Sequence, residues 1–202
     1  MENLIPTGEE PRAGTRQLLR LSPEILRFAQ TRGLELVINN FGETAAPVRA
    51  ILFAKSAETN WYVTWHHYRT IPVVERNDLP GFRAWSVKDG IQHVQPPAAV
   101  LESMITMRIH LDDCSEENGA IKFVAGSHKC GIIPEEDIAL ENHNARAATI
   151  AADAGDVIFM RPLILHASSK AVRPTNRRVL HIEYATRPLP QGLQWGSTPS
   201  NL

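Results

Sequence analysis

The residues of this chain that could do chemistry are mainly histidines, of which it has eight in 202 residues. Two imidazoles and one carboxylate on one face of an iron(II) ion make a typical oxygen-activating site. On a β-barrel this set usually comes from a His-x-Asp pair on one strand and a lone His on a distant strand, because residues i and i+2 point to the same side. His66, in W-H-H-Y-R-T, and His166, in L-I-L-H-A-S-S, are the candidate imidazoles.

Arg177 is the candidate for holding a carboxylate beside such a metal. The cosubstrate 2-oxoglutarate chelates iron(II) at one end, and its distal carboxylate then needs a fixed cation. Arginine suits this task because its planar fork binds a carboxylate in two places. Arg177 follows His166 across a turn, and Arg178 is its competitor. Strand alternation puts the two arginines on opposite faces, so only one of them can point inward.

A second pair of residues fits the His-x-Asp pattern literally. His110-Leu111-Asp112 lies well before His166, at a separation that some iron oxygenases use. It is therefore an alternative to His66 as the source of ligands. His93, His143 and His181 are expected to be surface or packing histidines, and Asp112 is otherwise expected to be a turn residue.

Short strands are the elements that must position these side chains. Apolar or β-branched segments separated by turn residues indicate a β-sandwich or barrel, and they cover residues 48–53, 62–65, 71–74, 104–111, 120–124, 147–152, 157–160, 163–166 and 179–185. Asn118-Gly119 would make a hairpin turn that places Cys114 opposite Phe123. The tail after Pro188 is expected to be coil.

Two helices are predicted beside the strands. Ser22 is a plausible N-cap, Pro23 fits the first helical position, and Gly33 can end the helix. A second, short helix is expected over residues 96–103. The sequence shows no repeat or linker, so one domain over 1–202 is predicted, with its core at about 48–186.

Composition excludes several classes of function. The formal net charge is −1 and no basic run occurs, which argues against a nucleic-acid partner. No apolar stretch approaches the roughly 18–20 residues of a membrane helix. The N-terminus lacks the pattern of a secretion signal, and two cysteines that do not face one another favour reduced thiols, so a cytoplasmic protein is expected. The oligomeric state is left open.

Four motifs in order resemble a known family. They are N-W-Y-V-T-W-H-H, R-I-H-L-D-D-C-S-E-E-N-G-A-I-K-F-V-A-G-S-H, A-G-D-V-I-F-M-R-P-L-I-L-H-A-S-S and N-R-R-V-L-H-I-E-Y-A. Together they resemble the phytanoyl-CoA dioxygenase family over about 48–185. The resemblance implies a mainly β fold, a double-stranded β-helix of the jelly-roll, cupin-like type. It also implies iron(II), 2-oxoglutarate and O2, with hydroxylation of a small organic substrate.

The same resemblance assigns roles to single residues. His66 and His166 match the family's two imidazole ligands, Arg177 its 2-oxoglutarate arginine, and Ser168 a hydroxyl that assists it. At 108–128 the family has a structural strand rather than ligands, which favours His66 over His110. The region after the metal strand borders the substrate in this family, so Trp85, Gln95 and Arg69 are the candidate substrate contacts.

The sequence departs from the family at the carboxylate ligand. Where the family has aspartate, this chain has Tyr68. His67 cannot replace it, because strand alternation turns its side chain to the other face unless a bulge intervenes. Ala125 also replaces the family's usual proline, in a loop. The expectation is an impaired 2-oxoglutarate-dependent dioxygenase. The alternative is a non-catalytic β-barrel that binds 2-oxoglutarate or another small acid, with a cupin-type metal isomerase as a more distant third.

Overall fold

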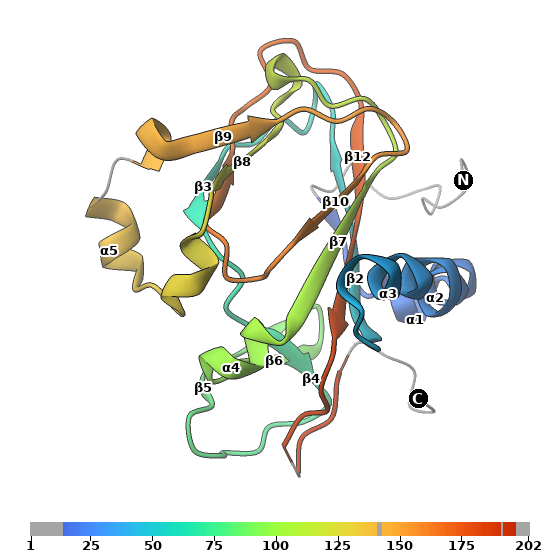
Figure 1. The fold of residues 1–202 in the computed structure, drawn as a ribbon, viewed down its shortest axis with the longest axis vertical. Helices are drawn as coiled ribbons and strands as arrows, with labels where there is room; N and C mark the ends of the chain where they lie inside the picture. Colours follow the sequence, from blue (N-terminus) through green and yellow to red (C-terminus); the bar gives the residue numbers. More distant parts are fainter. Residues whose placement is uncertain (1–13, 141–142, 191, 197–202) are drawn as a thin grey trace.

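The strands form three antiparallel sheets in the computed structural model, which describes residues 14–140, 143–190 and 192–196 (Figure 1). The largest sheet has the order β1 (Gly14–Thr15), β2 (Ala46–Lys55), β12 (Arg177–Ala185), β7 (Met104–His110) and β10 (Val157–Met160). The second has the order β3 (Val63–His66), β11 (His166–Ser168), β8 (Ile121–Val124) and β9 (Ala147–Ile150). A third small sheet joins β4 (Ile71–Val73), β6 (Ile91–Gln95) and β5 (Arg83–Lys88).

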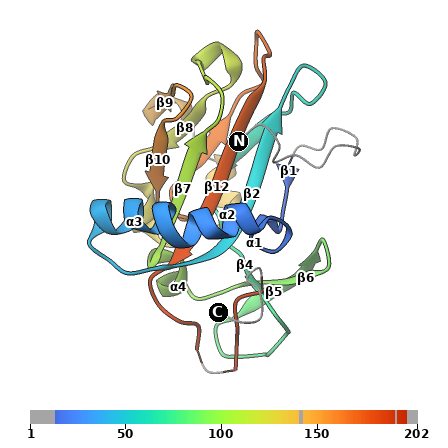
Figure 2. The same cartoon turned by 90° about the vertical axis from the view of Figure 1, so that its right-hand side faces the viewer.

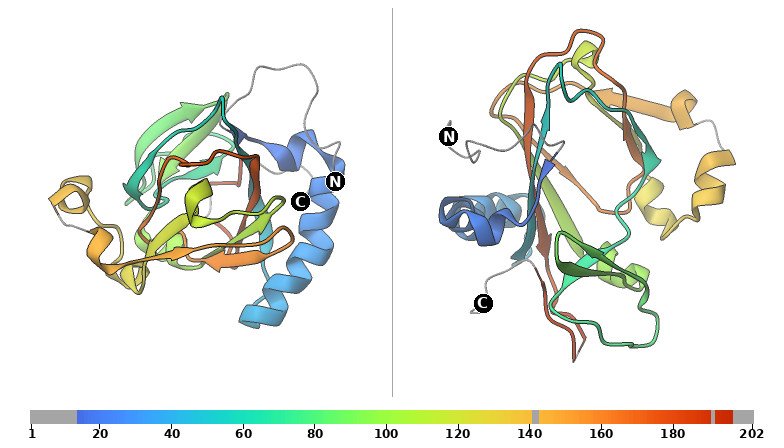
Figure 3. Two further views of the ribbon diagram at one scale, coloured as in Figure 1. Left: turned by 90° about the horizontal axis from the view of Figure 1, so that it is seen from above. Right: turned by 180° about the vertical axis from the view of Figure 1, so that it is seen from behind.

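The two larger sheets enclose a common interior. Seen from above, their strands are arranged around it (Figure 3). Side chains from β2, β7 and β12 of one sheet and from β3, β8 and β11 of the other line a single cavity there. The predicted mainly β, jelly-roll fold is confirmed. The strand predictions hold within a few residues, whereas β1, β5 and β6 were not predicted.

The N-terminal helical segment covers the outer face of the largest sheet (Figure 2). It consists of α1 (Leu18–Leu21), α2 (Pro23–Phe28), a π-helical turn (Ala29–Gly33) and α3 (Leu34–Phe41). The side chain of Ser22 accepts a hydrogen bond from the backbone N–H of Ile25 at 3.3 Å, which confirms the predicted N-cap. The remaining helices are short: α4 (Ala98–Glu102), α5 (Glu135–Leu140) and single turns at Glu116–Asn118, Ser127–Cys130 and His143–Arg146.

Gly33 does not end this helix, contrary to the prediction. It closes the π-turn, and the helix continues to Phe41, where Gly42 ends it with a left-handed φ of 69°. A Cβ on Gly33 would lie 2.3 Å from the hydroxyl of Tyr184, and that hydroxyl donates to the carbonyl of Ala29 at 3.0 Å. Gly33 is therefore required for close packing of the helix against the sheet, and not for a helix end.

The largest sheet buries both of its faces, and the two faces differ in chemistry. Its outer face is apolar and packs against the helices through residues such as Leu52, Met107 and Ile182. Its inner face alternates with these positions and carries buried polar side chains: Arg49, Lys55, Thr106, Arg108, His110, Arg177, His181 and Glu183. The polar residues of β2, β7 and β12 therefore point into the barrel.

The predicted hairpin at Asn118-Gly119 is wrong. The chain crosses there from β7 in one large sheet to β8 in the other, through the turn Glu116–Asn118. Gly119 has a φ of 74°, and a Cβ on it would lie 2.7 Å from the carbonyl oxygen of Ser169, so glycine is needed for this crossing. Cys114 pairs with Ala152 in an isolated bridge and does not face Phe123.

Both cysteines are free thiols, as predicted, with Cys114 buried and Cys130 exposed. Within the described ranges, no helix is both long and apolar enough to cross a membrane.

Candidate functional site

His66 and His166 lie directly opposite one another on neighbouring strands. They are Cα partners in the antiparallel ladder of β3 and β11, and their ring centroids are 4.2 Å apart. A register shift follows between His166 and Ser168. The structure thus brings together two imidazoles that are a hundred residues apart in sequence, as the prediction required.

The two imidazoles are also oriented alike. Nδ1 of His66 lies 2.9 Å from the carbonyl of Thr64, and Nδ1 of His166 lies 2.8 Å from that of Ile164. Each Nδ1 therefore donates, which leaves Nε2 of each ring as the nitrogen that carries the lone pair. Nε2 of His166 is buried without a partner among the described residues. Burial lowers the pKa of His66, and burial together with His66 lowers that of His166 well below its usual value, so both rings are neutral.

Tyr68 lies beside this pair in the interior. Its ring centroid is 4.7 Å from that of His166, 5.7 Å from His66 and 5.0 Å from His181. Burial raises the pKa of the phenol, with the Arg108 guanidinium opposing the rise only in part. The phenol therefore stays protonated at neutral pH.

A complete triad is absent from the part of the chain that the structure describes, where no group of three or more His, Cys, Asp or Glu side chains could hold a metal. His67 does not fill the gap, because its Nε2 accepts from the backbone N–H of Ile133 at 3.0 Å on the outer side of the strand. The two imidazoles fit a metal, and the third ligand position holds a neutral phenol.

The inner cavity, of about 250 Å³, extends from this pair toward a cationic end. His66, Tyr68, Arg108, His166, Ser168 and Arg177 supply its polar lining, and Phe53, Trp61 and Ile121 belong to its apolar wall. Arg177 is buried, donates to the carbonyl of Gly119, and has an Nε without a partner among the described residues. Burial lowers its pKa.

Lys55 was not singled out from the sequence. It does not itself line the cavity, but it contacts two residues that do, Ser168 and Trp61, near Arg177 at the cationic end. Its ammonium donates to the hydroxyl of Ser168 and to the carbonyl of Ser169, each at 3.1 Å, and lies 4.9 Å from the Trp61 ring centroid. Burial, and then Arg177, lower the pKa of Lys55 to about 8. One signal in the sequence could have found it: strand alternation places the side chain of Lys55 on the same face as that of Arg49.

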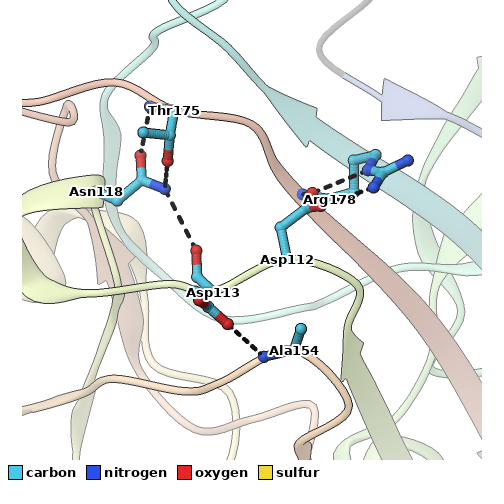
Figure 4. Close-up of polar contacts among 6 residues, drawn as sticks. All are labelled: Asp112, Asp113, Asn118, Ala154, Thr175 and Arg178. Atoms are coloured by element: carbon cyan, nitrogen blue, oxygen red, sulfur yellow. Dashed lines mark hydrogen bonds and ion pairs between the residues drawn. The ribbon is translucent and has the colours of Figure 1, made fainter.

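A polar network fixes the turn that carries Arg177 (Figure 4). Asn118 donates to the hydroxyl of Thr175 at 2.6 Å and accepts from its backbone N–H at 3.2 Å. Asp113 accepts from the N–H of Ala154 at 2.8 Å, which ties the crossing segment to the turn before β10. These contacts set where β12 begins, and so where the Arg177 side chain enters the barrel.

Arg178 points away from the cavity, as alternation predicted. Its Nε and Nη2 donate to Asp112 at 2.8 and 2.7 Å, and its backbone N–H donates to the same carboxylate (Figure 4). Asp112 is thus bonded on the outer side of the strand. His110 lies within the barrel wall, where burial and then Arg108 lower its pKa to about 4. The structure therefore commits Asp112 to Arg178, and His110 is not among the residues that line the cavity with His66 and His166.

A buried chain of polar groups lies behind Tyr68. Arg108 lies 3.3 Å from Nδ1 of His181, whose Nε2 lies 3.1 Å from Glu183, and Glu183 pairs with Arg49. Burial alone would raise the pKa of Glu183, but Arg49 and His181 outweigh it and hold the pKa at about 2. Burial lowers the pKa of His181 to about 4. His93, His143 and His181, expected to be surface or packing histidines, are all buried, so none of them is a surface residue.

The predicted substrate contacts are placed differently. Trp85 packs in a core cluster below the barrel with Arg76 over its ring, and the amide oxygen of Gln95 can accept from Arg83 at 2.9 and 3.0 Å. Neither residue lines the inner cavity. Arg69 pairs with Glu135 and lines an outer cavity of about 660 Å³, which shares His66 and Tyr68 with the inner one.

Solved structures share the fold. EvdMO1 is 21% identical with a TM-score of 0.63, over 91% of this chain and 38% of that one. AviO1 from Streptomyces viridochromogenes Tue57 is 20% identical with a TM-score of 0.60, over 92% and 74%. HygX from Streptomyces hygroscopicus, crystallised with nickel and 2-oxoglutarate bound, is 17% identical with a TM-score of 0.58, over 85% and 71%. The chain thus spans well under half of EvdMO1.

Among curated proteins no match to this sequence was found. The phytanoyl-CoA dioxygenase (PhyH) family, by contrast, matches residues 6–179, which is most of the chain. This match includes the first three sequence motifs in full and the first four residues, 176–179, of the fourth. The chain belongs to the phytanoyl-CoA dioxygenase family.

Proposed function

We propose that this chain is an iron(II)- and 2-oxoglutarate-dependent oxygenase that hydroxylates a small organic substrate, with a metal site weakened by Tyr68. His66 and His166 hold the metal in this proposal, and Arg177 holds the distal carboxylate of 2-oxoglutarate with Ser168 and Lys55. When bound, iron supplies the activation of O2 that is coupled to conversion of 2-oxoglutarate to succinate and carbon dioxide.

The observation that carries the proposal is the paired orientation of His66 and His166. Both rings donate through Nδ1 to a backbone carbonyl, so Nε2 carries the lone pair in each, and both residues line the same cavity. Such a hydrogen bond fixes the tautomer and raises the basicity of an imidazole ligand. Ligand imidazoles must be neutral, and burial lowers the pKa of both.

The cationic end supports 2-oxoglutarate as the cosubstrate. Lys55 and Arg177 are both buried, and neither contacts a carboxylate in the described part of the chain. Buried charges of one sign are unfavourable without a counterion. A dicarboxylate that reaches this end from the imidazoles supplies one, and Ser168 adds a hydroxyl.

Charge explains why the metal site is weak. Iron(II), two neutral imidazoles and the 2-oxoglutarate dianion together have a net charge of zero. With the family's aspartate as an additional ligand, the net charge would be −1. Tyr68 can replace that carboxylate only as phenolate, which from a free pKa near 10 takes roughly 4 kcal/mol at pH 7. Burial raises the pKa further. The metal is therefore held weakly until 2-oxoglutarate contributes its charge.

The test is anaerobic calorimetry of iron(II) binding with and without 2-oxoglutarate, followed by measurement of succinate release in air. The proposal expects weak iron binding that improves when 2-oxoglutarate is present, and slow succinate formation that needs both. The matched control is the variant His166→Ala. Iron binding that is equally strong in that variant would refute the ligand assignment.

A second candidate is a non-catalytic barrel that binds 2-oxoglutarate or another small acid. The neutral phenol at the carboxylate position favours it, because the cationic end is intact while the metal end is not. Stoichiometric 2-oxoglutarate binding without iron and without any succinate release would support this candidate over the enzyme.

A further inference from the structure

The barrel interior holds more positive than negative charge. Of the side chains that the structure describes, four buried ones are cationic, Arg49, Lys55, Arg108 and Arg177, whereas the one buried carboxylate is that of Glu183. Transfer of a charge from water into a protein is costly unless a counterion accompanies it. One 2-oxoglutarate dianion at Lys55 and Arg177 still leaves a cation without a partner.

Arg108 is that cation. Its side chain is 6% exposed, lines the inner cavity, and lies with its guanidinium carbon 5.7 Å from the Phe53 ring centroid. One Nη lies 3.3 Å from Nδ1 of His181, and its Nε is buried with no partner among the described residues. Arg108 thus lines the cavity with no carboxylate partner among the described residues, and a guanidinium in that setting is suited to binding an anion.

Glu183 does not neutralise Arg108. Its carboxylate pairs with Arg49 and lies 3.1 Å from Nε2 of His181. Because Arg108 can only donate, Nδ1 of His181 must accept, and the proton of this ring sits on Nε2. A neutral imidazole therefore stands between Arg108 and Glu183, and the charge of Glu183 is matched by Arg49.

The position that would normally supply a carboxylate here is 68. The Tyr68 ring lies against those of His166 and His181, and its phenol lies beside the Arg108 guanidinium. An aspartate at this position would place a negative charge between the imidazole pair and Arg108. Tyr68 removes that charge and leaves both the imidazoles and Arg108 facing the cavity.

We propose that Arg108 binds the carboxylate of a second small acid, the substrate, in place of the side-chain carboxylate that is missing at position 68. The proposal rests on the proposed function in calling this acid the substrate. Phe53, Trp61 and Ile121 provide the apolar wall for its body, and the cavity of about 250 Å³ limits its size. The substrate class is therefore a compact carboxylic acid with an apolar or aromatic body.

The experiment uses benzoate and its neutral analogue benzamide as probes. Each is titrated into the metal-free protein saturated with 2-oxoglutarate, and binding is followed by ligand-observed NMR. We expect benzoate to bind without displacing 2-oxoglutarate. Benzamide should bind more weakly than benzoate by at least about tenfold, as expected for loss of a charged hydrogen bond.

Variants assign the effect to Arg108. Arg108→Met should weaken benzoate binding by about tenfold or more, and Arg108→Lys should retain part of it. Arg161→Met is the control, because Arg161 lies over Phe41 outside the barrel. The affinity for 2-oxoglutarate should stay within about twofold in Arg161→Met, and in the Arg108 variants it should fall less than the affinity for benzoate.

Three results would overturn the proposal. Equal binding of benzoate and benzamide to the unmodified protein would show that no cation selects the carboxylate, and this comparison does not depend on any variant folding. Displacement of 2-oxoglutarate by benzoate would place Arg108 in the cosubstrate site. Unchanged benzoate binding in Arg108→Met would exclude Arg108. The experiment uses neither metal nor turnover, so its result does not depend on whether the protein proves to be an active oxygenase.

Discussion

The two ends of the inner cavity differ in how completely they are built. At the cationic end, Lys55, Ser168 and Arg177 converge, and the network around Asn118 fixes the strand that carries Arg177. At the other end the imidazoles of His66 and His166 are paired and oriented, but the third position holds a phenol. At both ends the backbone brings the polar side chains together. What is missing is one side-chain charge.

The difference also appears in the electrostatics. At the cationic end, Lys55 and Arg177 contact neutral groups and no carboxylate among the described residues, and burial lowers the pKa of both. The metal end is held neutral, since its imidazoles and its phenol are all driven toward their uncharged forms. We therefore expect the cavity to bind a dicarboxylate more readily than it binds a metal alone.

The largest expected effect separates His66 and His166 from the alternative pair. His66→Ala or His166→Ala should reduce bound metal to a trace, a loss greater than the about 10–100-fold caused by removing a supporting hydrogen bond. His110→Ala should keep most of the metal, since Asp112 is bonded to Arg178 on the outer side. Metal analysis of the purified variants measures this. Depletion in the His110 variant with retention in the His66 variant would move the site.

The next effect tests the cationic end. Arg177→Ala should cost about 3–5 kcal/mol, by analogy with breaking a buried ion pair, which is roughly a hundredfold or more in 2-oxoglutarate affinity. Arg178→Ala is the matched control and should bind 2-oxoglutarate normally, because Arg178 pairs with Asp112 away from the cavity. Calorimetry that finds equal losses in the two variants would contradict the assignment.

A smaller effect is expected from restoring a carboxylate at position 68, which would supply the negative charge that the imidazole end of the cavity lacks. Tyr68→Asp restores a negative charge beside the imidazoles, so iron(II) binding in the absence of 2-oxoglutarate should strengthen by about tenfold or more, and succinate formation should rise without substrate. Tyr68→Phe keeps the ring, lacks the hydroxyl and should leave metal affinity unchanged. If the unmodified protein turns over briskly and Tyr68→Asp abolishes activity, the tyrosine is itself a working ligand or substrate contact.

The smallest effect is the pH dependence of 2-oxoglutarate binding. Lys55 has a pKa of about 8 in the free protein, with Arg177, Ser168 and the Trp61 ring around it. A bound carboxylate raises that pKa, so binding takes up a proton above about pH 8. Affinity should therefore fall as pH rises through 8, approaching about tenfold per pH unit. Lys55→Met should bind more weakly with no such fall, and an unchanged slope in this variant would assign it to another group.

The sequence predicted most of the barrel because strand segments and turn residues are local signals. It misassigned Gly33 and Asn118-Gly119 for a shared reason. Gly33 looked like a helix end and Gly119 like part of a hairpin turn, but Gly33 makes room for the Tyr184 hydroxyl and Gly119 for the Ser169 carbonyl. These are contacts between segments far apart in the chain, and no local pattern encodes them.

The candidate site was predictable in part. Motif order singled out His66, His166, Ser168 and Arg177, which the structure places around one cavity, and alternation correctly turned Arg178 outward. Lys55 and Arg108 were missed because polar residues that alternate with apolar ones normally indicate a strand face exposed to water. In this chain the N-terminal helices cover the apolar face, so the polar face is the one inside the barrel.

The pairing of His66 with His166 across β3 and β11 has a consequence for how the site can evolve. Because the ladder sets the spacing of the imidazoles, the residue at position 68 can vary without dispersing them. A tyrosine codon becomes an aspartate codon through a change of its first base. Under the proposed function, the family's aspartate at position 68 is therefore one mutational step away, and it could be lost and regained without rebuilding the barrel.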